Sequence, residues 1–353
     1  MLDDIIEWEN LVRLIAIVFL SWCWLTCGRA QTAERAPEVR LVVIGVDGLS
    51  VDGVVTANTP RMHELIERSA WTLTARGVMP TLSSPNWASM IDGAGPEQHG
   101  ITSNGILRKM VEIQPVCLDS EGMFPTIFEV LREQQPASRI AIFHDWPGFA
   151  DLVEKHAPDI MQHVHGAAKT AETAAAYWRQ NHPSLMFVHL DNVDHTGHSE
   201  GWATPAYYRA VEDADRYVGV ILDMLRAESA LDSTFVLISS DHGGKGRGHG
   251  KNSLEEIQIP WIFSGPGVQP GKLQLPVYTF DTAATIAWIF GLDAPQCWIG
   301  RPVTGAFRTE LTLAHAPKKD VPAGNCAAET PLVVAAGPAP LTVAADGHLN
   351  HRD

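Results

Sequence analysis

The residues of this chain that could carry out chemistry lie just after apolar runs. Aspartate and histidine, which supply the oxygen and nitrogen ligands of borderline metals such as zinc, follow the runs LVVIGV, LMFVHL and FVLISS. Each residue alone fits a turn or a helix cap, but the combination predicts a site for divalent metal ions. These residues are Asp47, the D-x-x-x-H pair Asp194 and His198, and the pair Asp241 and His242.

A histidine in a glycine-rich loop and a serine before an expected helix complete the pattern. His249 lies in GGKGRGHG, and Ser83 begins the segment SSPN. A serine hydroxyl is a weak nucleophile until a base or a cation activates it, and the first N–H groups of a helix favour a developing negative charge. We therefore predict phosphoryl-transfer chemistry at two metal ions around a hydroxyl nucleophile.

These residues need a fold that brings distant segments together. Apolar, β-branched runs alternate with helical patterns, which indicates an α/β fold with a mainly parallel sheet and helices on both faces. Ligands of such sheets gather at the carboxyl ends of the strands, where the candidate residues lie. The expected strands are Val39–Asp47, Arg139–Phe143, Leu185–Leu190, Thr234–Ser240 and Ile259–Phe263. The expected helices are Pro60–Arg68, Thr126–Gln134, Ala167–Gln180, Pro205–Glu228 and Thr282–Phe290.

The composition excludes several classes of protein. With 45% apolar and 19% charged residues, the chain of 353 residues is predicted to fold rather than to be disordered. Its net charge of −15 argues against binding to a nucleic-acid backbone, because phosphate contacts need clustered lysine and arginine. A small phosphate-bearing substrate is compatible with this charge, since bound metal ions supply positive charge locally.

Residues 1–30 are predicted to be a secretory signal peptide. The apolar stretch from Leu11 to Trp24 precedes small residues that fit cleavage near Ala30. A membrane anchor and a lipid-modified Cys27 are the alternatives, but the apolar run is shorter than the ~20 residues of a membrane span. We therefore expect an extracytoplasmic protein, periplasmic or secreted, with no stable membrane span once the signal is removed.

The rest of the chain divides into two parts. A catalytic domain is expected over residues 38–315, and residues 316–353 form a tail rich in alanine and proline, for which we expect a flexible segment or, alternatively, a hairpin. Three cysteines remain after signal cleavage and permit at most one disulfide, whose pairing the sequence leaves open. They are Cys117, Cys297 and Cys326.

With these motifs in this order, the chain resembles the alkaline phosphatase superfamily and, within it, the nucleotide pyrophosphatase/phosphodiesterase branch. That branch has a Thr or Ser followed by x-Pro-Asn, which the segment from Ser83 to Asn86 matches. It also has an asparagine shortly after a Gly-Ile pair, which Asn104 in GITSN matches. The strand-end Asp, D-x-x-x-H and D-H-G motifs are present too, and the resemblance extends from Val39 to Arg301.

The resemblance implies an alkaline-phosphatase-like fold and a zinc-dependent phosphodiesterase or nucleotide pyrophosphatase. Ser83 would attack phosphorus to form a phosphoserine that water hydrolyses, and Asn104 would donate a hydrogen bond to a non-bridging oxygen. The implied substrate is a small phosphate ester that is nucleotide-like or phospholipid headgroup-like. The implied ligand sets are Asp194, His198 and His249 for one ion, and Asp47, Asp241, His242 and Ser83 for the other.

One histidine departs from the pattern of the branch. The last ligand of a typical phosphodiesterase lies far downstream of D-H-G, whereas His249 follows closely, as in the glycolipid ethanolamine-phosphate transferases of the superfamily; His315 is the alternative. A phosphomonoesterase or a phosphoethanolamine-type transferase is therefore the alternative function. Sulfatases need a C/S-x-P-x-R signature whose arginine is absent here, and a non-catalytic homologue would lack a ligand or the nucleophile, but none is lost.

Several other side chains have both a functional and a structural interpretation. His189 and Asp191 either orient metal-bound imidazoles or make ordinary buried hydrogen bonds. Trp146 and Phe149 either stack on a substrate or pack in the core, and His195 is expected to point away from the site. The candidates for the extra positive group of a monoesterase are Arg76, Lys245 and Arg247.

Overall fold

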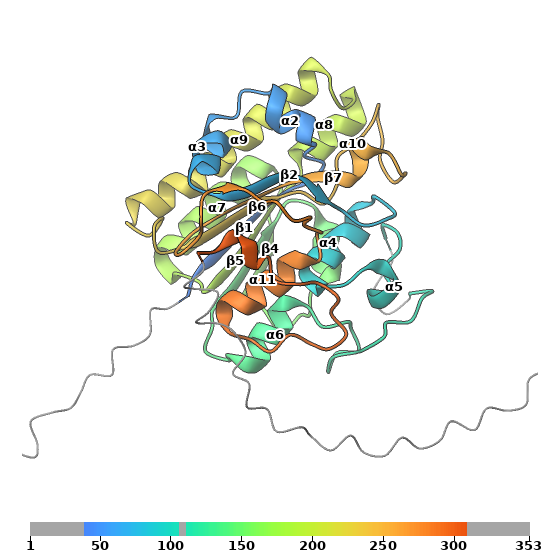
Figure 1. Cartoon of the computed structure of the whole chain (residues 1–353), viewed down its shortest axis with the longest axis vertical. Helices are drawn as coiled ribbons and strands as arrows, with labels where there is room; N and C mark the ends of the chain where they lie inside the picture. The colour runs from blue at the N-terminus through green and yellow to red at the C-terminus, as the bar shows by residue number, and fades with distance from the viewer. Residues whose placement is uncertain (1–38, 106–110, 309–353) are drawn as a thin grey trace, which may run out of the picture. The chain divides into compact units, whose positions relative to one another are not determined.

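Eight strands form one mixed sheet in the computed structural model, which describes residues 39–105 and 111–308 (Figure 1). The strands are β1 (Leu41–Val46), β2 (Ala70–Arg76), β3 (Ile140–His144), β4 (Ile160–His163), β5 (Leu185–Leu190), β6 (Phe235–Ser239), β7 (Gln258–Ser264) and β8 (Gly271–Lys272). Their order is β4-β3-β5-β1-β6-β7-β2-β8. The first five run parallel, β7 is antiparallel to both β6 and β2, and β8 is parallel to β2. The expected mainly parallel α/β fold is confirmed.

All five expected strands are present, and each is buried along nearly its whole length. Their continuous apolar runs fit a sheet that is covered on both faces. The strands β2, β4 and β8 were not predicted. In β2 buried and partly exposed residues alternate, β4 is partly or fully exposed throughout, and β8 has only two residues. None of the three therefore has the continuous apolar run that indicated the others.

The five expected helices begin and end within one residue of the predicted bounds. They are α3 (Pro60–Glu67), α6 (Ile127–Gln134), α7 (Ala167–Asn181), α9 (Pro205–Ala227) and α11 (Asp281–Phe290). Threonine caps fix two of the starts: the Thr126 hydroxyl accepts from two N–H groups of α6, and Thr204 accepts from Tyr207 in α9. The remaining helices are α2 (Val51–Thr56), α4 (Ser83–Asp92), α5 (Pro96–His99), α8 (Asn192–Glu200), α10 (Leu254–Ile257) and the 3-10 turns η2 (Pro147–Leu152) and η3 (Thr304–Ala306).

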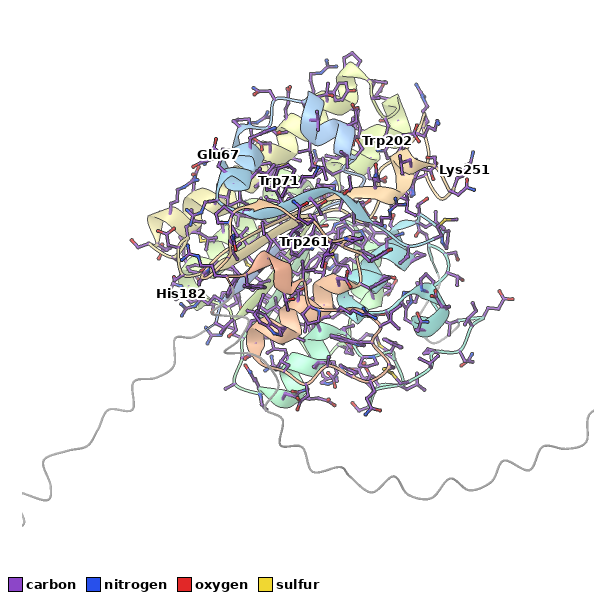
Figure 2. The ribbon with its side chains drawn as sticks, viewed as in Figure 1. Glu67, Trp71, His182, Trp202, Lys251 and Trp261 are labelled. Atoms are coloured by element: carbon purple, nitrogen blue, oxygen red, sulfur yellow. A yellow bond between two sulfur atoms is a disulfide. The ribbon has the colours of Figure 1, made fainter. Side chains whose placement is uncertain are left out.

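Helices cover both faces of the sheet. Neighbouring residues of β1 point to opposite faces, so Val43 packs in one apolar cluster and Val42 in the other. The helices α4, α6 and α11 lie on the first face, and α3, α7 and α9 lie on the second (Figure 1). On the neighbouring strands β7 and β2, Trp261 packs in the first cluster and Trp71 packs against the second; both are labelled in Figure 2.

A disulfide joins the segment before α6 to the segment after α11. It pairs Cys117 with Cys297, whose Cα atoms are 6.4 Å apart. The predicted signal peptide, the predicted tail, Cys326 and the alternative ligand His315 all lie outside the described residues. Among the residues that the structure does describe, no helix combines the length and the apolarity needed to cross a membrane.

Candidate active site

The order of the strands brings the candidate residues to one edge of the sheet. In the centre of the sheet β1 lies between β5 and β6 and runs parallel to both. Asp47 follows β1, Asp194 lies in the first turn of α8 after β5, and Asp241 follows β6. A pocket of about 160 Å³ opens at this edge. Six of the predicted residues line it, namely Asp47, Ser83, Asn104, Asp194, His198 and His249.

The remaining two predicted residues, Asp241 and His242, are fully buried next to the pocket. His242 Nε2 lies 3.0 Å from Asp241 Oδ2, 3.6 Å from Asp47 Oδ1 and 3.3 Å from the Ser83 hydroxyl. Asp47 Oδ1 and Asp241 Oδ2 are buried and accept no hydrogen bond within the described structure. The set predicted for one ion is therefore assembled, with two carboxylate oxygens left for a cation.

The set predicted for the other ion is also assembled. Asp194 Oδ2 lies 3.4 Å from His198 Nε2, and Asp194 Oδ1 lies 3.6 Å from His249 Nε2. A tight turn in which Lys245 N–H donates to Gly248 O brings His249 back to the site. The rings of His249 and His242 stack with centroids 3.6 Å apart, so the two sets are adjacent.

Backbone hydrogen bonds fix how the imidazoles face the site. His242 Nδ1 donates to Gly243 O at 2.8 Å, and His249 Nδ1 donates to Thr81 O at 2.7 Å. His198 Nδ1 lies 3.2 Å from Arg247 O. With each Nδ1 proton used in this way, each Nε2 carries a lone pair toward the site, as a metal-binding histidine requires.

The buried charges fit a cation as well. Burial raises the pKa of Asp47 and Asp241 well above the usual range, and each is raised further by a neighbouring carboxylate. Burial also raises the pKa of Asp194 to about 6 and lowers that of His249 to about 3. Closely spaced carboxylates repel one another in a buried site, and a divalent cation removes that repulsion. The donor set therefore fits the divalent metals that the sequence predicted.

Ser83 is the first residue of α4, so its hydroxyl lies at the helix N-terminus next to the predicted ligands. The neighbouring Ser84 N–H donates to Asn104 Oδ1 at 2.8 Å. Because that oxygen accepts from the backbone, the amide nitrogen of Asn104 remains as the donor toward the pocket. The side chain can therefore offer a hydrogen bond to an anion in front of Ser83.

A buried asparagine holds the loop before Ser83. Asn86 Nδ2 donates to Pro80 O at 3.1 Å and to Leu82 O at 2.9 Å, and Asn86 Oδ1 accepts from Val78 N at 2.6 Å. The side chain is fully buried. The asparagine of the SSPN segment therefore shapes the turn that presents the serine.

Three further residues line the pocket, namely Trp146, Asp191 and His195. The expectation that His195 points away was wrong. Asp191 is the N-terminal cap of α8, and His195 N–H donates to Asp191 O at 3.1 Å, so both residues lie at the same end of the helix. Burial and the nearby Asp47 raise the pKa of Asp191 to about 8. Phe149, in contrast, is a core residue that stacks on Phe187 with centroids 4.9 Å apart.

Two tryptophans and a histidine support the ligands from behind. Trp87 Nε1 donates to Asp47 Oδ2 at 2.9 Å, and His189 Nε2 lies 3.0 Å from the same oxygen. This pair leaves Asp47 Oδ1 facing the site. Trp202, labelled in Figure 2, donates to the carbonyl after Asp47 and packs edge-on against His198 with centroids 5.4 Å apart. Only His189 was identified from the sequence. Trp87 and Trp202 were missed because no motif marks a tryptophan that supports a site from within the core.

The candidate cations lie elsewhere. Arg76, Lys245 and Arg247 do not line the pocket, and Lys245 pairs with Glu255 at 3.1 Å. Among the described residues that line the pocket there is no lysine or arginine.

The chain is similar in sequence to proteins of a known family. The model of the family described as type I phosphodiesterase / nucleotide pyrophosphatase matches residues 41–247. The mouse (Mus musculus) ectonucleotide pyrophosphatase/phosphodiesterase family member 1 is 27% identical over 240 residues, which cover 63% of this chain and 26% of that protein. The Saccharomyces cerevisiae ectonucleotide pyrophosphatase/phosphodiesterase 2 is 25% identical over 230 residues, or 57% of this chain and 47% of the relative. The chain thus spans less than half the length of these relatives.

Solved structures share the fold. Murine ectonucleotide pyrophosphatase/phosphodiesterase 5 matches with a TM-score of 0.62 at 15% identity, covering 76% of this chain and all of that one. An inactive T72A form of the same murine protein has been solved in complex with AMP. A 2-O GAG sulfatase matches with a TM-score of 0.61 at 18% identity, covering 77% of this chain and 74% of the sulfatase.

Proposed function

Because the chain belongs to the type I phosphodiesterase / nucleotide pyrophosphatase family of the alkaline phosphatase superfamily, we propose that it hydrolyses phosphate diesters or pyrophosphates with divalent metal ions. The observation that carries the proposal is a set of three buried carboxylate oxygens without hydrogen-bond partners in the described structure. They belong to Asp47, Asp194 and Asp241, whose side chains converge at the pocket with Ser83. Unpaired buried carboxylates are costly unless a cation neutralises them.

Two ions, with zinc as the proposed identity, would be held by the two predicted ligand sets. When bound, they would polarise the phosphoryl group and stabilise negative charge on the entering and leaving oxygens. The proposed sets are Asp194, His198 and His249, and Asp47, Asp241, His242 and Ser83. The ligand atoms of Asp47, Asp241 and His242 lie within 4.8 Å of one another, which supports the second set. Those of Asp194 and His249 form such a cluster with His242 instead of His198, and His198 is placed in the first set because its Nε2 lies 3.4 Å from Asp194 Oδ2.

The chain's own residues perform the displacement in this proposal. The Ser83 oxygen forms a bond to phosphorus while the bond from phosphorus to the leaving oxygen breaks; the hydroxyl proton passes to solvent, and the leaving oxygen takes up a proton from solvent. In the second step a water oxygen bonds to phosphorus and loses a proton, the bond from phosphorus to the Ser83 oxygen breaks, that oxygen is protonated again, and the phosphate monoester leaves. Asn104 donates through Nδ2 to a non-bridging oxygen, where charge develops, while Ser84 N–H holds its Oδ1 in place.

A diester is favoured over a monoester by the charge of the pocket. A monoester carries an additional negative charge, and the described residues that line the pocket include no lysine or arginine to balance it. Trp146 and His195 line the pocket and offer an aromatic and an imidazole surface to the rest of the substrate. We propose a nucleotide-like substrate. His249 follows the D-H-G motif closely in the sequence, so a phosphoethanolamine-type transferase remains the alternative function.

We also propose that the protein works outside the cytoplasm. The disulfide between Cys117 and Cys297 supports this location, since disulfides persist in oxidising compartments. The predicted signal peptide supports it independently.

The function is tested by assaying the zinc-loaded full chain with bis(p-nitrophenyl) phosphate, p-nitrophenyl phosphate and p-nitrophenyl sulfate. We expect the diester to have the highest kcat/KM. Ser83→Ala should lower kcat by at least about a thousandfold and leave the metal content largely intact, because Asp47, Asp241 and His242 remain to hold that ion. Ser84→Ala should retain most of the activity. A preference for the monoester or the sulfate would overturn the substrate assignment. Loss of turnover in Ser84→Ala but not in Ser83→Ala would show that the nucleophile is the next residue.

A further inference from the structure

A second, much larger pocket lies away from the candidate active site. Its volume is about 930 Å³, within the range of small-molecule sites. It is lined by residues 269–276 around β8, by Tyr278, Phe280 and Asp281 at the start of α11, and by Ile299 and residues 301–305. It shares no lining residue with the pocket that contains Ser83.

The frame of this pocket is held by backbone hydrogen bonds. Leu273 N–H donates to Trp71 O and Thr279 N–H donates to Arg76 O, each at 2.8 Å, which ties one wall along β2. On the other wall, Ile299 N–H donates at 2.9 Å to the carbonyl of the glycine that caps α4. Because both walls are fixed to regular elements, the pocket exists before any ligand binds.

The walls expose an unusual amount of apolar side chain. Leu275 is 76% exposed, Ile299 43% and Tyr278 40%, and all three line this one pocket. The Tyr278 ring stacks on Phe280 with centroids 5.2 Å apart and an angle of 5°. Large apolar side chains that are exposed together in a concave site usually bind a ligand or a partner.

The charge of the pocket is opposite to that of the chain. Lys272 and Arg301 line it, and neither side chain forms an ion pair with any described residue. The one acidic lining residue, Asp281, is 7% exposed. Its two oxygens accept from the backbone N–H groups of Tyr278 at 2.8 Å and Arg301 at 2.9 Å. In a chain of net charge −15, this pocket therefore presents two cations that form no ion pair with a described residue, beside an apolar wall, and the charge of Asp281 offsets part of that of Arg301.

We propose that this pocket binds a free amphipathic anion, an aliphatic chain that carries a single acidic group. The chain lies against Leu275, Tyr278 and Ile299, and the acidic group pairs with Lys272 and Arg301. The cations exclude a cationic amphiphile, and the apolar wall excludes a small inorganic anion as the preferred ligand. The proposal is independent of the phosphodiesterase function, because it rests on a different pocket.

Titration calorimetry of the full chain with dodecanoate, below its micelle concentration, tests the proposal. We expect one site per chain, no comparable binding of dodecyltrimethylammonium, and an affinity at least about tenfold lower in the double variant Lys272→Glu/Arg301→Glu. The matched control is Lys155→Glu/Arg209→Glu, which makes the same charge change at exposed residues outside the pocket. The control should bind dodecanoate like the unaltered chain. Thermal unfolding and diesterase activity should be the same in all three proteins.

Several results would overturn the proposal. One is an affinity for dodecanoate that the pocket variant does not change, or that both variants lower equally. Another is equal binding of the cationic amphiphile. In a parallel arm, sedimentation with phosphatidylglycerol vesicles that depends on Lys272 and Arg301, without binding of free dodecanoate, would identify the pocket as a membrane contact instead.

Discussion

At the scale of single residues, the contact between His198 and His249 is the most informative. Their Nε2 atoms lie 3.0 Å apart, and His249 Nδ1 already donates to Thr81 O. Burial lowers the pKa of His249 to about 3, so this ring is neutral near pH 7 and its Nε2 offers a lone pair. That lone pair can accept a proton shared with His198 Nε2 or can bind a cation together with Asp194.

The same contact predicts the effect of removing His249. His249→Ala should lower both zinc affinity and kcat/KM for a diester by at least about a hundredfold, because one of three ligands of an ion is lost. The measurements are metal content by mass spectrometry and turnover of bis(p-nitrophenyl) phosphate. His315→Ala is the matched control and should keep both. If instead His315→Ala lost zinc and His249→Ala kept it, the last ligand would lie downstream, as in the typical phosphodiesterase.

Asn104 allows a more specific test, since its two amide atoms have separate roles. In Asn104→Asp the oxygen that accepts from Ser84 N–H is kept, but the donor toward the pocket is replaced by an oxygen. We expect kcat to fall by about 10²–10³-fold, as for other lost transition-state donors, with zinc content unchanged. An unchanged kcat would contradict the role assigned to Nδ2. A parallel loss of zinc would place Asn104 among the groups that hold the metal site together.

At the scale of elements, the start of α4 carries Ser83, the proposed nucleophile, and the turn before it determines where Ser83 lies. Asn86 satisfies several backbone groups of that turn while being fully buried. Asn86→Ala leaves these groups without partners, so the free energy of unfolding should fall by about 2–4 kcal/mol and kcat should fall as Ser83 moves. Urea denaturation measures the first effect. The exposed Asn58→Ala is the control and should be neutral; equal stability of the two variants would contradict the role of Asn86.

The elements that sequence predicts well are those whose pattern follows from burial alone. β5 is buried on both faces, so its apolar run gives its exact bounds, Leu185–Leu190. β2 was missed because only some of its residues are buried and its register shifts between Thr72 and Ala75. The prediction for His195 was wrong for a related reason. Which side of a short helix such as α8 faces a pocket depends on tertiary packing, and the neighbouring residues in the sequence do not determine it.

At the scale of the whole described structure, the strand order explains why the candidate site could be predicted from the sequence while the residues that support it could not. Any parallel sheet places Asp47 and Asp241 at one edge, so convergence follows from the fold class. The observed order places β5 beside β1 and so brings His189 onto Asp47 Oδ2. Trp87 reaches the same oxygen from α4, and Trp202 packs on His198 from the segment after α8. These supports depend on contacts between segments far apart in the chain.

The buried carboxylates also make the stability of the domain depend on pH and metal together. Burial raises the pKa of Asp194 to about 6 and that of Asp191 to about 8, and it also raises that of Asp241 well above the ordinary 3.8. As pH rises through this window, the unfolded chain releases protons that the metal-free folded chain retains, so its stability falls; the lowered pKa of His249 opposes this only below about pH 6.5. Zinc binds the ionised carboxylates, so it should stabilise the folded protein more at higher pH than at lower pH. The difference in thermal midpoint between zinc-loaded and EDTA-treated protein should therefore widen from about pH 6 to about pH 8, and Ser83→Ala should show the same widening. A constant or narrowing difference would mean that Asp194 and Asp241 do not hold the metal.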